Sequence, residues 1–230
     1  MQIEILDFVA GARAARGVAV VIDVFRAFSV ACYAYDGGVE RVLPMADLEA
    51  SLALKRANPD YLAIGERQGR KVAGFDFNNS PTEICSADLK GRTLVHNTSA
   101  GTQGLTNASQ ADVVITGSLV NAAAICRYIE SLAPDRVSIV RMGKAALERS
   151  DEDDLCAELL AARLKGEPFD VSSVRSRLRY APAALKFFDP QADWAPETDF
   201  ALCTDVDRFD FVLRLREDAA GVKYLERVDA

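Results

Sequence analysis

The feature that constrains the fold most is a repeated succession of a short apolar run, a polar loop and a helical pattern. Six runs recur along the chain: 18–23, 39–43, 61–64, 93–95, 113–116 and 137–140. Continuous apolar runs of this length are typical of strands buried on both faces, and their alternation with helices indicates a mainly parallel sheet. The sequence therefore predicts an α/β fold, a mainly parallel or mixed sheet flanked by helices. Helices are expected at 26–35, 47–57, 121–132 and 150–164.

The C-terminal part follows a different pattern. Residues 172–188 are basic and helix-like, interrupted by Pro182. Three strand-like segments follow at 200–203, 209–215 and 222–228, and Gly221 suits a hairpin between the last two. A boundary near 108–112 would divide the chain into two similar α/β halves. The half at 1–110 carries Asp23 and the segment 65–81, and the half at 111–230 carries an acidic helix start and the β-rich C-terminal part. One long sheet fits the pattern equally well.

Composition excludes several classes of function. The 230 residues include 27 Lys and Arg against 34 Asp and Glu, a net charge of −7. Nucleic acids and anionic membranes are bound by basic surfaces, so neither is an expected partner. The single histidine, His96, excludes a three-histidine zinc site. The five cysteines show no C-x-x-C spacing, which indicates reduced thiols. Neither a signal peptide nor an apolar span of about 20 residues is seen, so a cytoplasmic protein is expected.

Polar residues follow the predicted strands. The carboxyl ends of parallel strands meet at one edge of a sheet, so residues far apart in sequence should gather there. The residues concerned are Asp23, Glu66, 97–102, Ser118, Asn121, Arg141 and Gly143.

Two of these features have both a functional and a structural interpretation. A carboxylate at the end of a buried strand, such as Asp23, is paired, metal-bound or at the mouth of a cleft, and the simplest pairing is with Arg26. The small hydroxyl-rich loop 97–102 suits a phosphate or sulfonate, but N-capping by Ser99 or Thr102 would also explain it.

Charged runs occur near the end of the chain. Ser150 precedes four consecutive acids, 151–154. Helix capping and the helix dipole account for some of them, but a divalent cation would relieve their repulsion, and hard oxygen ligands suit magnesium. Lys186 and the arginines at 175, 177 and 179 are more typical of a solvated helix face.

Six short segments in this order resemble the 2-phosphosulfolactate phosphatase family. They are VVIDVFRA (20–27), GER (65–67), GFDFNNSP (74–81), GT (101–102), GSLVNA (117–122) and EDDLCA (152–157). The resemblance implies a magnesium-dependent phosphatase that releases sulfolactate from its phosphate ester, a step of coenzyme M biosynthesis, with its site in a cleft. Gln68, Asn78 and Ala100 depart from the family pattern, and Ala100 removes a side-chain donor from the 97–102 loop.

The first hypothesis is a phosphoric monoester hydrolase that acts on a small anionic phosphorylated acid. Its proposed Mg²⁺ ligands are Asp23, Glu66 and Asp153, with Asp23 and Arg26 as catalytic residues. Substrate would be bound by Arg67, Asn79, Ser80, Ser99, Gly101, Thr102, Ser118 and Asn121. The nucleophile is either a metal-activated water or Asp23 itself.

The second hypothesis is a non-catalytic protein that binds a phosphorylated metabolite on the same scaffold. The reason for it is Ala100, which removes a side-chain donor from the 97–102 loop. The oligomeric state is left open, a homo-oligomer included.

The two adjacent acids Glu152 and Asp153 point about 100° apart on a helix. Asp153 shares the apolar side with Cys156 and Ala157, which predicts that Asp153 faces inward and Glu152 faces solvent or a cap.

Overall fold

A mixed sheet organises the molecule. The computed structural model describes residues 1–230, and the sheet order is β1-β8-β2-β7-β9-β10-β3-β6-β4-β5. The ten strands are β1 (Gln2–Asp7), β2 (Val18–Ile22), β3 (Arg41–Met45), β4 (Leu62–Arg67), β5 (Arg70–Lys71), β6 (Thr93–Asn97), β7 (Val113–Gly117), β8 (Arg136–Arg141), β9 (Phe211–Glu217) and β10 (Lys223–Asp229). The predicted α/β class with a mixed sheet is confirmed.

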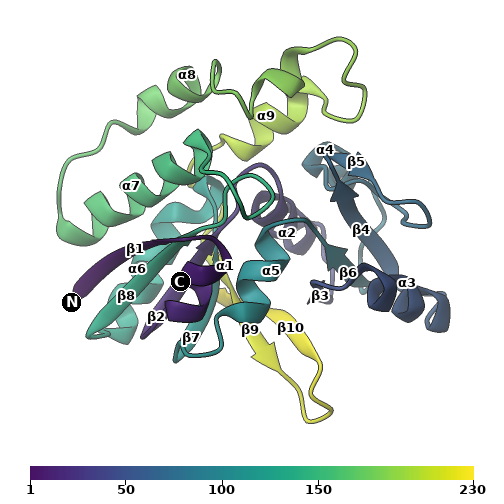
Figure 1. Ribbon diagram of the computed structural model, residues 1–230, viewed down its shortest axis with the longest axis horizontal. Helices are drawn as coiled ribbons and strands as arrows, with labels where there is room; N and C mark the ends of the chain where they lie inside the picture. Colours follow the sequence, from purple (N-terminus) through teal and green to yellow (C-terminus); the bar gives the residue numbers. More distant parts are fainter.

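Two parallel blocks are joined by one antiparallel hairpin. Strands β1, β8, β2 and β7 pair in parallel, and so do β3, β6 and β4. The β9–β10 hairpin lies between the blocks (Figure 1), and it meets each through a single register pair, Ile115 with Arg214 and Val42 with Leu225. The hairpin turn is the predicted one, with Gly221 at φ +79°.

Helices cover both faces of the larger block. The α-helices are α1 (Phe8–Ala14), α2 (Ala27–Asp36), α3 (Leu48–Ala57), α4 (Pro81–Cys85), α5 (Gly101–Asn107), α6 (Ala122–Leu132), α7 (Asp151–Lys165), α8 (Val174–Leu178) and α9 (Glu197–Cys203). Three 3₁₀ turns complete them: η1 (Leu119–Asn121), η2 (Val171–Ser173) and η3 (Leu185–Phe188).

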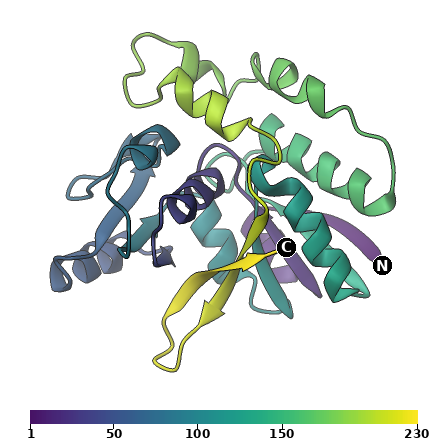
Figure 2. The ribbon, with the colours of Figure 1, turned by 180° about the vertical axis from the view of Figure 1, so that it is seen from behind.

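Strand β2 shows how the layers are built. All five of its residues are buried, and successive side chains point to opposite faces. Ala19 and Val21 pack in a core with residues of α1, α2 and α5. Val18, Val20 and Ile22 pack in a second core with residues of α6, α7 and α8. The two views in Figures 1 and 2 show these helix layers on the two sides of the sheet. Burial on both faces explains the uninterrupted apolar run.

A close backbone approach joins β4 to β6. A Cβ on Gly65 would lie 2.0 Å from the carbonyl oxygen of Asn97, so no side chain fits there. The glycine therefore lets β4 approach β6 closely, and it brings Glu66 next to the loop that follows β6.

Three segments differ from the prediction. Residues 200–203, expected as a strand, belong to helix α9, in which Phe200 packs in the second core and Leu202 packs against the first. The basic stretch 172–188 is divided into η2, α8 and η3. The apolar-run pattern does not predict strand β1 and helix α1, because β1 lies at the sheet edge, mixes polar with apolar residues and has no fully buried residue.

The division near residue 110 stays a prediction. The sheet order interleaves the two stretches, since β2 from the first pairs with β7 and β8 from the second.

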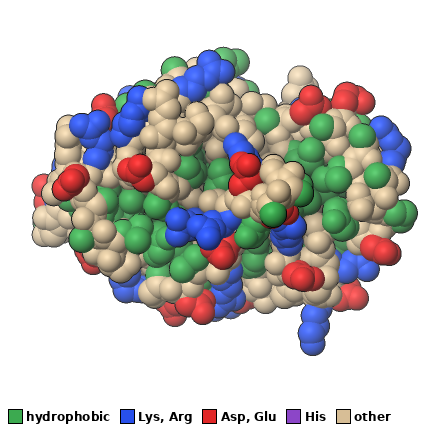
Figure 3. Space-filling model, turned by 90° about the horizontal axis from the view of Figure 1, so that it is seen from below, with side chains coloured by type: hydrophobic (Ala, Val, Ile, Leu, Met, Phe, Trp, Pro, Cys, Tyr) green, Lys and Arg blue, Asp and Glu red, His purple; other side chains and the backbone are tan.

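The surface mixes charges of both signs. On the face drawn in Figure 3, Lys and Arg side chains lie among Asp and Glu side chains and apolar patches. None of the helices combines the length and apolar character that crossing a bilayer requires.

The hairpin should be essential to the core between the two blocks. Leu225 on β10 is buried in the first core, whereas Val222 near the hairpin turn is 40% exposed. We expect Leu225→Ala to lower the free energy of unfolding by about 2–5 kcal/mol through the cavity it leaves, and Val222→Ala to lower it by less than about 1 kcal/mol. Urea unfolding of both variants measures this. Equal, small losses would show that the hairpin contributes little to the core.

Candidate active site

Acidic side chains gather at the carboxyl edge of the sheet. Asp23 follows β2 directly, Glu66 lies near the end of β4, and Glu152 and Asp153 are in the first turn of α7. The parallel topology brings these elements to one edge although they are distant in sequence.

Asp23 joins two loops through its carboxylate. Its Oδ1 accepts the Ala27 N–H at 3.2 Å, and its Oδ2 accepts the Gly101 N–H at 2.8 Å. A Cβ on Gly101 would lie 2.8 Å from that same Oδ2, so glycine is needed at the start of α5. Asp23 thus fixes the loop after β6 against the end of β2.

Glu66 makes an equivalent bridge. Its Oε1 accepts the Ser99 N–H at 2.9 Å, and its Oε2 accepts the Gly69 N–H at 2.8 Å. The backbone amides of Ser99 and Gly101, predicted to bind an anion from the substrate, are therefore bonded to carboxylates of the protein.

Asp153 faces inward as predicted. Its two oxygens accept the Val24 N–H at 2.9 Å and the Gly143 N–H at 2.8 Å, so α7 is tied to the ends of β2 and β8.

The prediction that Glu152 faces solvent is wrong, and the alternative, a cap position, stays a prediction. This side chain is 5% exposed, and its Oε2 has no hydrogen-bond partner. The helical angle between the two acids gives their relative direction, but it does not reveal what covers the helix. The chain around Lys186 approaches here, and its charge lowers the pKa of Glu152, although burial dominates.

Burial raises the pKa of three carboxyls, those of Asp23, Glu152 and Asp153. The pKa of Asp23 is raised to about 6 and that of Glu152 to about 7. The pKa of Asp153 lies well above its ordinary range, because burial is reinforced by the charges of Glu152 and Asp23. Backbone N–H donors act in the opposite direction at Asp23 and Asp153. The edge therefore concentrates negative charge that is poorly solvated, and a cation there would stabilise it.

This carboxylate set fits a divalent cation that takes few protein ligands. No three Asp, Glu, His or Cys side chains are close enough together to hold one ion. Magnesium is commonly held by one or two carboxylates, with waters and substrate phosphate as the other ligands. The unpartnered Glu152 Oε2 and the Asp23 carboxylate supply oxygens of this kind.

Arg26 is paired with Asp199 and not with Asp23. Its Nη1 lies 2.6 Å from Asp199 Oδ2 and also donates to the Trp194 carbonyl, while Nη2 donates to the Gly69 carbonyl. The guanidinium is 2% exposed. Arg26 therefore binds protein groups on several sides in this conformation.

Most of the other predicted substrate-binding side chains also have protein partners. Arg67 donates to the Glu66 carbonyl at 2.7 Å and is half-buried. The remaining pairs are Asn79 with His96, Ser80 with Asp199, Thr102 with Thr98, Ser118 with Ser29, and Asn121 with the Phe211 carbonyl. Their role in substrate binding stays a prediction.

Sequence reasoning misses Asp199 and Lys186 as residues of this region. Asp199 is fully buried and accepts bonds from Arg26, the Ser80 hydroxyl and the Thr82 N–H. It lies next to a segment predicted to be a strand, and no motif singles it out. Lys186 is predicted to lie on a solvated face because its charged neighbours in sequence are arginines.

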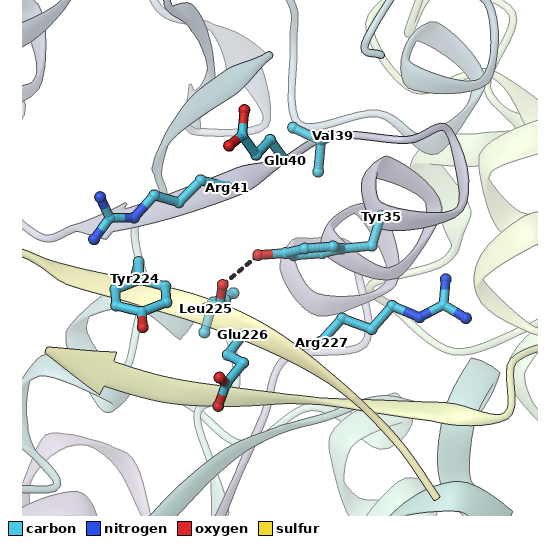
Figure 4. A pocket seen from close by; sticks show the side chains of 8 residues that line it. All are labelled: Tyr35, Val39, Glu40, Arg41, Tyr224, Leu225, Glu226 and Arg227. Atoms are coloured by element: carbon cyan, nitrogen blue, oxygen red, sulfur yellow. Dashed lines mark hydrogen bonds between the residues drawn. The ribbon is translucent and has the colours of Figure 1, made fainter. Parts of the chain in front are cut away.

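A cavity of about 450 Å³ lies elsewhere, between α2, β3 and β10. Figure 4 shows Arg41, stacked on Tyr224 at 4.1 Å, at its edge, and Tyr35 donating to the Leu225 carbonyl. None of the four clustered acids lines it, so the chemistry is assigned to the strand ends.

The buried Asp23 carboxyl should make stability depend on pH. Its pKa rises from 3.8 to about 6 on folding, so the folded protein keeps a proton that the unfolded chain releases. Stability from this group is complete below about pH 4 and is lost as the pH rises through about 6. An asparagine at this position cannot titrate, although it loses one acceptor at every pH. We therefore expect the free energy of unfolding of Asp23→Asn, relative to wild type, to increase by about 1–3 kcal/mol from pH 4 to pH 7 without metal.

Urea unfolding in chelator at several pH values measures this difference, with Asp60→Asn, an exposed site, as control. A difference that does not change with pH would mean that the Asp23 carboxyl is solvated.

Comparison with known proteins identifies the family of the chain. A family model described as 2-phosphosulpholactate phosphatase matches residues 6–218. The chain is 30% identical over 212 residues to the "Probable 2-phosphosulfolactate phosphatase" of Bacillus subtilis, covering 91% of each chain. Proteins of the same name from Caldanaerobacter subterraneus and Clostridium tetani are each 32% identical, with 86% and 82% of this chain and 87% and 82% of theirs covered. The chain therefore belongs to the 2-phosphosulpholactate phosphatase family and is a phosphoric monoester hydrolase.

Proposed function

We propose that the protein hydrolyses 2-phosphosulfolactate to sulfolactate and phosphate in a magnesium-dependent reaction. The observation that supports this is the cluster of buried carboxylates with raised pKa values at the strand ends of a phosphatase-family chain. An ester with a phosphate, a carboxylate and a sulfonate cannot approach such a cluster without cations that offset the repulsion.

The candidate ligands are Asp23, Glu66 and Asp153, and Glu152 is added because its Oε2 lacks a partner. Because no three of these side chains are close enough together to hold one ion, we propose that one or two of them bind Mg²⁺ directly, and that water and substrate phosphate complete its ligands. A bound Mg²⁺ would supply charge neutralisation on phosphoryl oxygens and a water of lowered pKa. The protein's own contribution is positioning: Asp23 and Glu66 hold the loop after β6, and Asp153 holds the turns after β2 and β8.

We propose water as the nucleophile. Both Asp23 oxygens already accept backbone N–H bonds, and raising the pKa of its carboxyl increases the protonated, non-nucleophilic fraction near neutral pH. Direct attack by Asp23 is the competing route, and it would leave a phosphoryl group on this residue during turnover.

The place of this reaction in coenzyme M biosynthesis and a cytoplasmic location belong to the same proposal. Five cysteines without a disulfide are consistent with a reducing compartment.

Removal of the Asp23 charge should abolish most of the activity. We expect Asp23→Asn to lower kcat/KM for 2-phosphosulfolactate at least about tenfold with saturating Mg²⁺, a loss of about 1.4 kcal/mol or more. Asp60→Asn should match wild type, and chelator should abolish activity of both active proteins. Phosphate release measures all three. Activity of Asp23→Asn within tenfold of wild type would contradict a metal-binding or nucleophilic role.

Glu152 and Asp153 should differ in what they stabilise. Glu152→Gln removes a buried charge whose Oε2 has no partner, so we expect an unchanged or higher Tm and at least about a tenfold higher Mg²⁺ concentration for half-maximal activity. Asp153→Asn should raise the Mg²⁺ requirement and also lower Tm, because it disrupts bonds to Val24 and Gly143. Glu158→Gln, exposed on the same helix, is the control.

Magnesium titrations and thermal unfolding decide this. A Glu152→Gln variant with an unchanged Mg²⁺ requirement would remove Glu152 from the proposed metal site.

A further inference from the structure

A cap segment, defined as residues 171–196, is anchored over the turn that follows β2. The Phe187 ring lies edge-on to Phe25, with ring centroids 5.2 Å apart. The Trp194 carbonyl accepts bonds from Arg26 at 3.1 Å and Asn78 at 3.0 Å. These contacts fix both the 3₁₀ turn η3 and the end of the segment against the active-site edge.

Lys186 lies on η3 next to the anchored Phe187. Its side chain is partly buried, and its ammonium has neither a hydrogen bond nor an ion pair within the protein, although it lies 5.0 Å from the Phe187 ring centroid. Burial and the nearby Arg26 charge lower its pKa, while Glu152 and Asp23 act in the opposite direction. The ammonium is therefore beside the carboxylate cluster but not bound to it.

The arginines near Lys186 are already bonded to protein groups. Arg26 is bound to Asp199 and two carbonyls. Three further arginines of the cap segment bind Thr204, Glu158 and Glu197. Lys186 thus differs from its neighbours in sequence, because it keeps all three N–H donors.

We propose that Lys186 binds a phosphoryl oxygen of the substrate, an inference that rests on the proposed function. An oxyanion beside Lys186 would supply the missing partner of the ammonium and relieve its repulsion with Arg26. A lysine ammonium binds phosphate as a point charge, and Lys186 is near enough to Glu152 and Asp23 for their charges to raise its pKa.

The test uses inorganic phosphate, the reaction product, as probe. We expect Lys186→Met to raise the phosphate inhibition constant at saturating Mg²⁺ at least tenfold and to raise KM for 2-phosphosulfolactate, while Lys186→Arg restores part of both. The Mg²⁺ affinity of the phosphate-free Lys186→Met protein should be unchanged or tighter, because a cation next to the carboxylates has been removed. Lys90→Met, at an exposed turn, is the matched control.

The outcomes separate this inference from the function on which it rests. If wild type neither binds phosphate nor hydrolyses the ester with Mg²⁺, the proposed function fails. If wild type does both and Lys186→Met has the phosphate inhibition constant of Lys90→Met, the role of Lys186 is overturned while the function stands. A lower Tm with unchanged phosphate inhibition would likewise assign Lys186 to a purely structural charge balance.

Discussion

The active-site edge depends on carboxylates that accept backbone N–H bonds from neighbouring loops. Asp23 holds Ala27 and Gly101, and Asp153 holds Val24 and Gly143. Each bond satisfies an amide that would otherwise be buried without a partner, which costs about 1–3 kcal/mol. The same carboxylates bring negative charge into a poorly solvated region. One set of residues therefore both assembles the edge and creates its need for cations.

A buried ion pair between Arg26 and Asp199 positions the segments that pack on this edge. Asp199 binds Arg26 and also the Ser80 hydroxyl and the Thr82 N–H, so it links the turn after β2 to the start of α4. Removing one partner of a buried ion pair leaves the other charge buried without a partner, which lowers the free energy of unfolding by about 3–5 kcal/mol. Through Arg26 the pair also reaches the Trp194 carbonyl, and so the position of the cap segment depends on it.

Local patterns in the sequence predicted several elements of both blocks. Val18–Ile22 forms the buried strand, a helix begins after Asp47, and the acids after Ser150 open α7 as expected. The positions of the motifs along the chain led to the prediction that Asp23, Glu66 and Asp153 lie together. Periodicity did not reveal Asp199, whose partners are more than 110 residues away in sequence, nor that a remote segment buries Glu152. Contacts of this kind depend on tertiary packing, which local patterns do not encode.

Calorimetry of Mg²⁺ binding to the metal-free protein tests the central claim, that cations neutralise the buried carboxylates, most directly. Raised pKa values of about 6 for Asp23 and about 7 for Glu152 mean that metal binding must displace protons from these groups. Titration at pH 6 in two buffers of different ionisation enthalpy gives the number of protons released. The account predicts release of at least about one proton per Mg²⁺ at pH 6, with tighter binding and less release at pH 8. Binding without proton release at either pH, or no binding, would contradict it.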